Sequence, residues 1–113
     1  MTTVHRANDP LLQPYQLKHL TLRNRFMSTA HEPNYHHDGM PRDRYIRYHE
    51  EKAKGGIALT MTAGSAVVSR DSSPVFGNLH GYKDEIVPWL KRMADACHEH
   101  GSACMIQLTH LGR

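Results

Sequence analysis

The chain has 113 residues, of which 39% are hydrophobic and 22% charged, a balance typical of one small globular domain. No run of about 18 apolar residues occurs, which excludes a membrane-spanning helix, and the first 14 residues lack the apolar core of a signal peptide. The net charge of +3 comes from 14 basic and 11 acidic side chains that are interspersed, which excludes a nucleic-acid-binding footprint.

The first part of the chain is expected to hold short strands and no helix. Residues 1–14 form an irregular lead, because two proline-containing pairs interrupt regular structure. Residues 15–22 alternate in part between apolar and polar side chains, which predicts a hairpin of two short strands. A third strand is predicted over residues 25–30, and residues 31–40 form a polar loop.

A helix and a buried strand are predicted next. Residues 41–54 favour a helix with Pro41 in its first turn, and the two glycines that follow end it. Residues 57–63 are apolar or small without polar alternation, which is typical of a parallel strand buried on both faces. Gly64 is expected to end this strand.

A long connection over residues 65–83 precedes the second helix, and connections of this length are more often functional than idle. Asp84 is expected to cap the helix. The helix carries one apolar stripe at helical spacing, formed by Ile86, Leu90, Met93 and Cys97. Gly101 ends the helix, and residues 103–108 form another compact strand.

The predicted order is a hairpin followed by strand, helix, strand, helix and strand. Strands that alternate with helices in this way imply parallel βαβ units. We therefore expect an α/β fold made of the first three βα units of a TIM (β/α)₈ barrel behind an N-terminal β-hairpin. Because a complete barrel needs about 250 residues, we expect residues 15–113 to be a partial, truncated barrel.

Four blocks of the chain form a pattern in sequence order. They are residues 20–31 (LTLRNRFMSTAH), 51–59 (EKAKGGIAL), 84–85 (DE) and 101–113 (GSACMIQLTHLGR). Together they resemble the start of the old yellow enzyme family, and more closely its branch containing 2,4-dienoyl-CoA reductase and trimethylamine dehydrogenase. The resemblance covers nearly the whole chain from about Pro14 onward.

The resemblance implies a non-covalent FMN cofactor at the C-terminal mouth of the barrel. It assigns to the flavin ring Ser28, Thr29, Ala30, His31, Gly64 and Gln107. The first four would contact the ring largely through backbone atoms, and the glycine would let the ring approach the chain. Gln107 would hydrogen-bond the pyrimidine edge, since its amide is both donor and acceptor. Glu32 stands where the trimethylamine dehydrogenase pattern has the cysteine that bonds the flavin.

The resemblance also implies an activity for a longer enzyme of which this chain is the N-terminal portion. Such an enzyme transfers hydride through FMN to or from a small-molecule substrate, as an NAD(P)H-linked ene-reductase or as an amine dehydrogenase or N-demethylase. The iron–sulfur cluster of this branch would lie in the missing C-terminal part. No residue of this chain is assigned as a catalytic residue.

Structural interpretations of the same residues stay open. Ser28 and Thr29 at a strand end could satisfy the backbone of a turn, and Gly64 could simply terminate a strand. Gln107 within an apolar strand is harder to explain as structure, because a buried amide needs partners.

The sequence was also compared with two alternatives: a self-associating fragment and a metal-binding module. The chain could be a non-catalytic α/β fragment that self-associates through exposed strand edges and binds no flavin alone; we expect a homo-oligomer.

His31, His36 and His37 suggest a metal site, but their loop offers no second ligand cluster, so no metal is expected. Two cysteines are too few for a disulfide framework, which favours a reduced, cytoplasmic setting.

Overall fold

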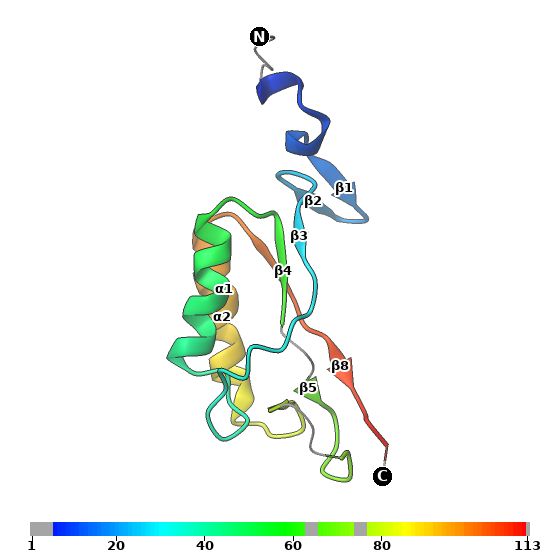
Figure 1. Cartoon of the computed structure of the whole chain (residues 1–113), viewed down its shortest axis with the longest axis vertical. Coiled ribbons are helices and arrows are strands. Elements are labelled where there is room, and N and C mark those ends of the chain that lie inside the picture. Colours follow the sequence, from blue (N-terminus) through cyan, green and yellow to red (C-terminus); the bar gives the residue numbers. More distant parts are fainter. Residues whose placement is uncertain (1–5, 63–65, 74–76, 113) are drawn as a thin grey trace.

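A computed structural model describes residues 6–62, 66–73 and 77–112. Two short 3₁₀ helices open the described chain, η1 (Arg6–Asn8) and η2 (Pro10–Leu12). The strands and α-helices follow in the order β1 (Tyr15–Leu17), β2 (Leu20–Leu22), β3 (Met27–Ser28), α1 (Asp43–Lys54), β4 (Leu59–Met61), β5 (Ala66–Val67), β6 (Leu79–His80), α2 (Ile86–Glu99), β7 (Ala103–Met105) and β8 (Leu108–Thr109) (Figure 1).

The predicted hairpin and parallel strands are present. Strands β1 and β2 pair antiparallel, while β3, β4 and β7 form a parallel sheet in that order. This is the strand order of consecutive right-handed βαβ units, which confirms the predicted α/β fold. The three strands are shorter than the sequence predicted, because regular pairing covers only part of each predicted strand.

A second parallel sheet was not predicted. Strand β5 lies between β6 and β8, so the connection over residues 65–83 contains two strands and is not one long loop. Ala66 pairs with Leu79 on one side and with Leu108 on the other. Each of these strands is two residues long, which is too short to show a periodic pattern in the sequence.

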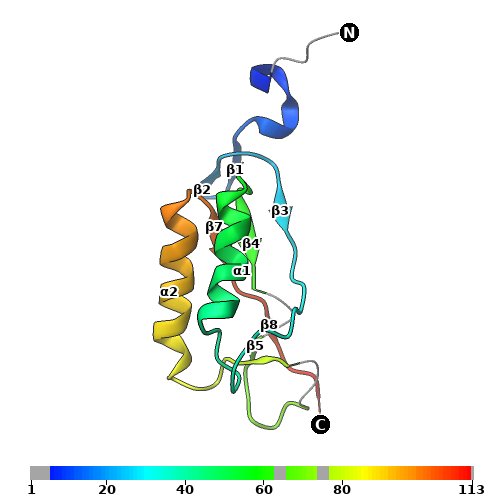
Figure 2. The ribbon, with the colours of Figure 1, turned by 60° about the vertical axis from the view of Figure 1, so that its left-hand side comes forward.

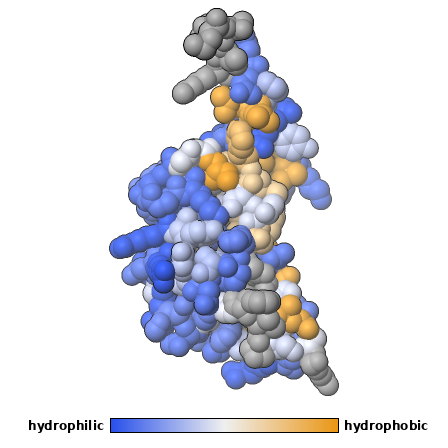
Figure 3. All heavy atoms as spheres, in the orientation of Figure 1, coloured by the Kyte–Doolittle hydropathy of each residue, from blue (hydrophilic) through white to orange (hydrophobic). Residues whose placement is uncertain are grey.

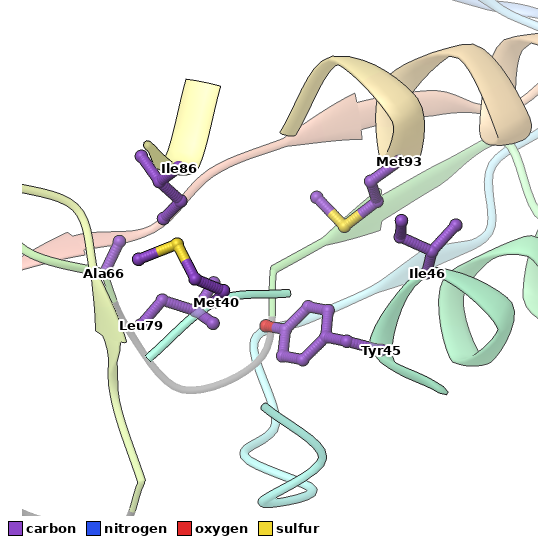
Figure 4. Packing of buried hydrophobic residues seen from close by; sticks show 7 residues of the cluster. All are labelled: Met40, Tyr45, Ile46, Ala66, Leu79, Ile86 and Met93. Carbon is purple, nitrogen blue, oxygen red and sulfur yellow. The ribbon is translucent and has the colours of Figure 1, made fainter. Parts of the chain in front are cut away.

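Both helices lie side by side on the same side of β4 and β7 (Figure 2). Their buried side chains meet the second sheet in one cluster, formed by Met40, Tyr45, Ile46, Ala66, Leu79, Ile86 and Met93 (Figure 4). The predicted stripe of α2 contributes Ile86 and Met93 to this core, with Leu90 packed against it. Burial of these apolar side chains holds the helices, the first sheet and the second sheet together.

The predicted helix starts were wrong in detail. Arg42 is the N-cap of α1, so Pro41 lies just before the helix and not in its first turn. Glu85 is the N-cap of α2 and its side chain makes no capping hydrogen bond. Asp84 therefore does not cap this helix with its carboxylate; its backbone carbonyl accepts from Val87 at 3.1 Å. The predicted stop at Gly101 is confirmed, with a positive φ of 80°.

Part of the opposite face of the first sheet is exposed in the described structure. Met27 and Met105 are 49% and 38% exposed there, although they lie on paired strands. Figure 3 shows hydrophilic surface over the helices and apolar surface along the hairpin and the strands. At the other end of the strands the hairpin covers part of the sheet, where Leu22 packs with Ala58 and Leu59.

Arg23, at the end of the hairpin, joins three separate parts of the fold. Its guanidinium donates to the carbonyl oxygen of His100 at 2.5 Å and to those of Ala53 at 2.8 Å and Ile57 at 2.9 Å. The first two carbonyls lie at the C-terminal ends of α2 and α1, where the helix dipole is negative and backbone acceptors lack partners. Arg23 therefore satisfies both helix ends with one charged side chain.

We predict that Arg23→Met lowers the free energy of unfolding by about 1–3 kcal/mol, because three charge-assisted hydrogen bonds to backbone acceptors are lost. Urea denaturation followed by circular dichroism measures the change. Arg25→Met is the matched control. Within the described residues the Arg25 guanidinium contacts the Tyr15 ring and makes no side-chain hydrogen bond, so this substitution should cost less than about 1 kcal/mol. Equal midpoints for the two variants would contradict the prediction.

Candidate functional site

The C-terminal ends of β3, β4 and β7 meet at one edge of the first sheet. Ser28 pairs with Thr60, and Met61 pairs with Met105. Residues 29–31 and Gln107 follow directly beyond these paired positions, so the structure brings the predicted residues of strands β3 and β7 to the same edge. Parallel α/β proteins bind their ligands at this edge. Gly64 lies outside the described residues.

The side chain of Ser28 faces the helices. Its hydroxyl accepts a hydrogen bond of 2.7 Å from Nζ of Lys52 on α1, and the Lys52 ammonium also lies 4.2 Å from the centre of the Tyr48 ring. Successive side chains of a strand point to opposite faces, so Thr29 points away from the helices, and it is exposed. Ser28 can reach a ligand on the open face only through its backbone.

The chain just after β3 carries unused hydrogen-bond donors. Within the described residues, no acceptor pairs with the backbone amides of Thr29, Ala30 and His31. Because these residues are exposed or half-buried, their unpaired amides are open to solvent and can donate to a ligand. They fit a flat ring with acceptor atoms, which is the arrangement that the flavin resemblance implies for this segment.

Gln107 presents a free side-chain amide at the same edge. Its backbone N–H donates to Oγ1 of Thr62 at 3.0 Å, and its carbonyl accepts from the amide of Ala66 at 2.9 Å. The expectation that its side chain is buried was wrong: the residue is exposed, and in the described part of the chain its amide has no partner. Hydrogen bonds fix the backbone of Gln107 on both sides and leave its side-chain amide able to hydrogen-bond a ligand.

Glu32 is a feature of this edge whose environment the sequence did not reveal. One carboxylate oxygen accepts from the amide of Asn34 at 2.8 Å, while the other is buried without a partner among the described residues. Burial raises the pKa of Glu32 above its usual range, which outweighs the hydrogen bond from Asn34 and the charge of His31. The environment therefore favours a protonated carboxyl compared with an ordinary glutamate.

A hollow of about 350 Å³ lies beside this edge, over the second sheet. We call it the polar pocket; it is lined among others by His36, Ser69, Arg70, Ser72, His80 and Tyr82. Its wall is joined to the segment after Gln107, because the amide of Val68 donates to the carbonyl of Thr109 at 3.0 Å. The sequence did not reveal this pocket, since its lining residues come from three separate loops and two two-residue strands.

His49 lies under the sheet and serves the core. It is fully buried, its Nδ1 lies 2.8 Å from Oγ1 of Thr60, and its ring contacts those of Tyr45 and Tyr48, each at 5.2 Å between centroids. Burial, together with the nearby charge of Lys52, lowers the pKa of His49 to about 4. The imidazole is therefore neutral at pH 7 and acts as a polar tie between α1 and β4.

The described ranges contain neither a cluster of metal ligands nor a helix suited to spanning a membrane. No three histidine, cysteine, aspartate or glutamate side chains gather there in a way that could hold a metal ion. No helix within those ranges is long and apolar enough to cross a membrane.

The parallel sheet and its two helices define the N-terminal part of an α/β barrel, and comparison with known proteins gives the family. Residues 10–113 match the NADH:flavin oxidoreductase / NADH oxidase family. The chain belongs to this family, as the sequence resemblance predicted.

Curated relatives support the assignment. The chain is 70% identical over 106 residues to a probable N-methylproline demethylase of Rhizobium meliloti (strain 1021), covering 94% of this chain. It is 54% identical over 113 residues to a multifunctional alkene reductase/demethylase of Caballeronia cordobensis, covering all of this chain. In both cases the match spans only 16% of the relative's length.

Solved structures confirm the fold. The chain superimposes with a TM-score of 0.84 and 25% identity on 2-naphthoyl-CoA reductase in complex with 2-naphthoyl-CoA, over 92% of this chain and 16% of that one. It superimposes with a TM-score of 0.81 and 26% identity on the old yellow enzyme of Trypanosoma cruzi, over 92% and 28%. The described units are thus the N-terminal part of the barrel of these enzymes.

We predict that the free energy of unfolding decreases as the pH falls from about 6.5 to 4. In this window the unfolded chain protonates His49, whose ordinary pKa is about 6.5, while the folded chain does not until about pH 4. The loss reaches about 3 kcal/mol at the lower limit. Urea midpoints at pH 7 and pH 4.5 measure it, and His49→Asn should flatten the pH dependence. An unchanged slope in that variant would contradict the prediction.

Proposed function

We propose that this chain supplies the first part of the FMN site of an oxidoreductase that demethylates N-methylated amino acids. The observation that carries the proposal is the sheet edge where the free amide of Gln107 and the unpaired backbone amides of residues 29–31 stand together. The 70% identity to a probable N-methylproline demethylase and the 45% identity to an N,N-dimethylglycine/sarcosine dehydrogenase of Chromohalobacter salexigens support the substrate class.

Each residue of the edge has a distinct role in this proposal. The backbone of Ser28 and the amides of Thr29, Ala30 and His31 bind the flavin ring, and Gln107 binds its pyrimidine edge through both amide atoms. FMN held by these residues would supply a two-electron acceptor for the substrate's N-methyl C–H bond. The substrate would lose a hydride to become an iminium, which water converts to formaldehyde, the demethylated amine and a proton. Dioxygen or another electron acceptor would reoxidise the flavin for the next turnover.

Two further features shape the proposed site. Gly64, by the family resemblance, leaves room for the ring to approach the chain. Glu32 has no thiol to bond the flavin, so the FMN is non-covalent.

Reduction of alkenes with NAD(P)H is a second activity that we propose for the same site. The 54% identity to a protein described as both an alkene reductase and a demethylase supports it. Both activities use one hydride-transfer site and differ in whether the organic substrate gives or receives the hydride. A reducing, cytoplasmic compartment fits the free thiols of Cys97 and Cys104.

The flavin-loaded enzyme that carries this chain should release one formaldehyde per turnover from N-methylproline and should bleach its flavin when oxygen is absent. Gln107→Leu should weaken FMN binding about tenfold or more, because one or two hydrogen bonds are lost. Fluorescence titration of FMN and a colorimetric formaldehyde assay measure the two effects.

Two variants serve as controls for this experiment. Gln16→Leu makes the same change in the hairpin, away from the edge, and should leave FMN binding unchanged. Ser28→Ala should retain FMN affinity, since its hydroxyl faces Lys52. Absence of formaldehyde from the wild-type enzyme would overturn the proposed activity, and unchanged affinity in Gln107→Leu would overturn the assigned role.

Self-association is the second candidate property. Strands β3 and β7 are the two edges of the first sheet, and beside them Met27, Met105 and Leu108 are 49%, 38% and 62% exposed. Open strand edges and an apolar face favour pairing with a second copy.

We predict that the 113-residue chain by itself forms oligomers, because the open face of its first sheet exposes Met27 and Met105. We also predict that it retains no FMN through gel filtration, because its match spans only 16% of the length of each of two curated relatives. Light scattering during the gel filtration measures the mass. The double variant Met27→Lys, Met105→Lys should shift the mass toward the monomer by charging the exposed face. A monomeric wild-type chain that elutes with a flavin absorbance band would contradict both parts.

A further inference from the structure

The polar pocket has the dimensions and position of a ligand subsite. Its volume of about 350 Å³ lies within the range of about 300–1,000 Å³ that is usual for small-molecule pockets. Its wall continues from the candidate flavin edge, since Ala66 of β5 donates to the carbonyl of Gln107 and Val68 donates to that of Thr109. The strand that contributes Val67 to the pocket wall is thus hydrogen-bonded to the segment that carries Gln107.

Arg70 gives this pocket a positive charge that the fold does not use. Its guanidinium lies 5.5 Å from the centre of the Tyr82 ring, which also lines the pocket. Among the described residues no carboxylate forms an ion pair with Arg70. The neighbouring Asp71 pairs instead with Nε2 of His110 at 2.9 Å. Hydrogen bonds from the Ser69 side chain and from the His110 ring lower the pKa of Asp71 to about 2.

His36 adds a neutral donor to the same wall. The backbone amide of Gly39 donates to Nδ1 of His36 at 2.9 Å, so in the neutral imidazole the proton is assigned to Nε2. Within the described residues this Nε2–H group has no acceptor. His80, which also lines the pocket, has a buried Nδ1 without a partner in that part of the chain. Polar atoms left unpaired beside a cavity point to a polar ligand.

Two glycines allow the imidazoles to approach the backbone this closely. Gly77 has a φ of 65°, and a Cβ there would lie 2.5 Å from Nε2 of His36. Gly39 has a φ of 74°, and a Cβ there would overlap the His80 ring. Both positions favour glycine because of their backbone conformation as well. The chain therefore has glycine at the two places where any side chain would displace a histidine of the pocket wall.

We propose that the polar pocket binds the carboxylate of an N-methylated amino acid substrate, with Arg70 as the charged partner and His36 Nε2–H as a second donor. A guanidinium matches a carboxylate in charge and in its two parallel donors. Arg70 is the one permanently charged residue among those that line the pocket in the described structure, which suits a monoanion better than a phosphate dianion. The inference rests on the proposed demethylase function for the identity of the substrate.

Direct binding to the chain tests the pocket without the flavin. N-methylproline, added to the isotopically labelled 113-residue chain, should shift the NMR signals of the Arg70 side chain and the His36 ring. N-methylpyrrolidine, the same ring amine without a carboxylate, should not shift them. Arg70→Gln should weaken N-methylproline binding about tenfold or more. Arg47→Gln is the matched control, because it removes the same charge from the exposed surface of α1 and should leave binding unchanged.

Kinetics of the flavin-loaded enzyme provide the second arm. Arg70→Gln should raise KM for N-methylproline about tenfold or more with a smaller change in kcat. The KM of Arg70→Lys should lie between those of the wild type and Arg70→Gln, since lysine keeps the charge but lacks the two parallel donors of the guanidinium. Turnover of N-methylpyrrolidine should be unaffected by either variant.

The outcomes separate the pocket from the proposed function. If the wild-type enzyme releases no formaldehyde, the demethylase function fails while the NMR titration still decides the pocket. Equal binding of the carboxylate-free amine, undiminished binding in Arg70→Gln, or tighter binding of inorganic phosphate than of N-methylproline would each overturn the pocket assignment.

Discussion

The arrangement of this fold depends on the hydrogen bonds of Arg23. One guanidinium binds carbonyls at the ends of α1 and α2 and at Ile57, just before β4. Asn24 beside it donates to the carbonyl of Gly56 at 2.7 Å. Both helix-to-strand turns are thereby held against the hairpin, so β4 and β7 start level with each other. Because paired strands of equal length that start level also end level, the same interactions determine where the ligand edge lies.

Much of the first sheet and both helices could be predicted from the sequence because their signals are local. The stop at Gly101 needs only a residue that tolerates a positive φ, and the buried strand β4 follows from an uninterrupted apolar run. Strands β5 and β6 gave no such signal. Ala66 can pair with Leu108 only because β7 lies beside β4. The second sheet therefore depends on tertiary contacts and not on a local sequence pattern.

The sequence located the strand ends that carry the candidate residues, but not the direction of their side chains. Ser28 and Gln107 both lie at the expected edge, because a strand end can be read from where an apolar run stops. Which face a side chain takes depends on register, and a shift of one residue reverses it. This is why the hydroxyl of Ser28 meets Lys52 while Gln107 is exposed. The polar pocket was out of reach, since His36 and Arg70 are brought together only by the folded loops.

The candidate flavin edge and the polar pocket are stabilised by different interactions. The edge lies on a sheet whose open face exposes Met27 and Met105, and an apolar face of this kind is stable only when other structure covers it. The pocket wall is fixed by bonds within this chain: Asp71 pairs with His110, and Ser72 accepts from the amide of Leu111 at 3.0 Å. In our proposal, cofactor binding therefore depends on what packs against the sheet, whereas the proposed carboxylate-binding groups are fixed by these loops. A change in the charge preference of the proposed pocket would then arise in the second sheet without disturbing the strand ends proposed to hold the flavin.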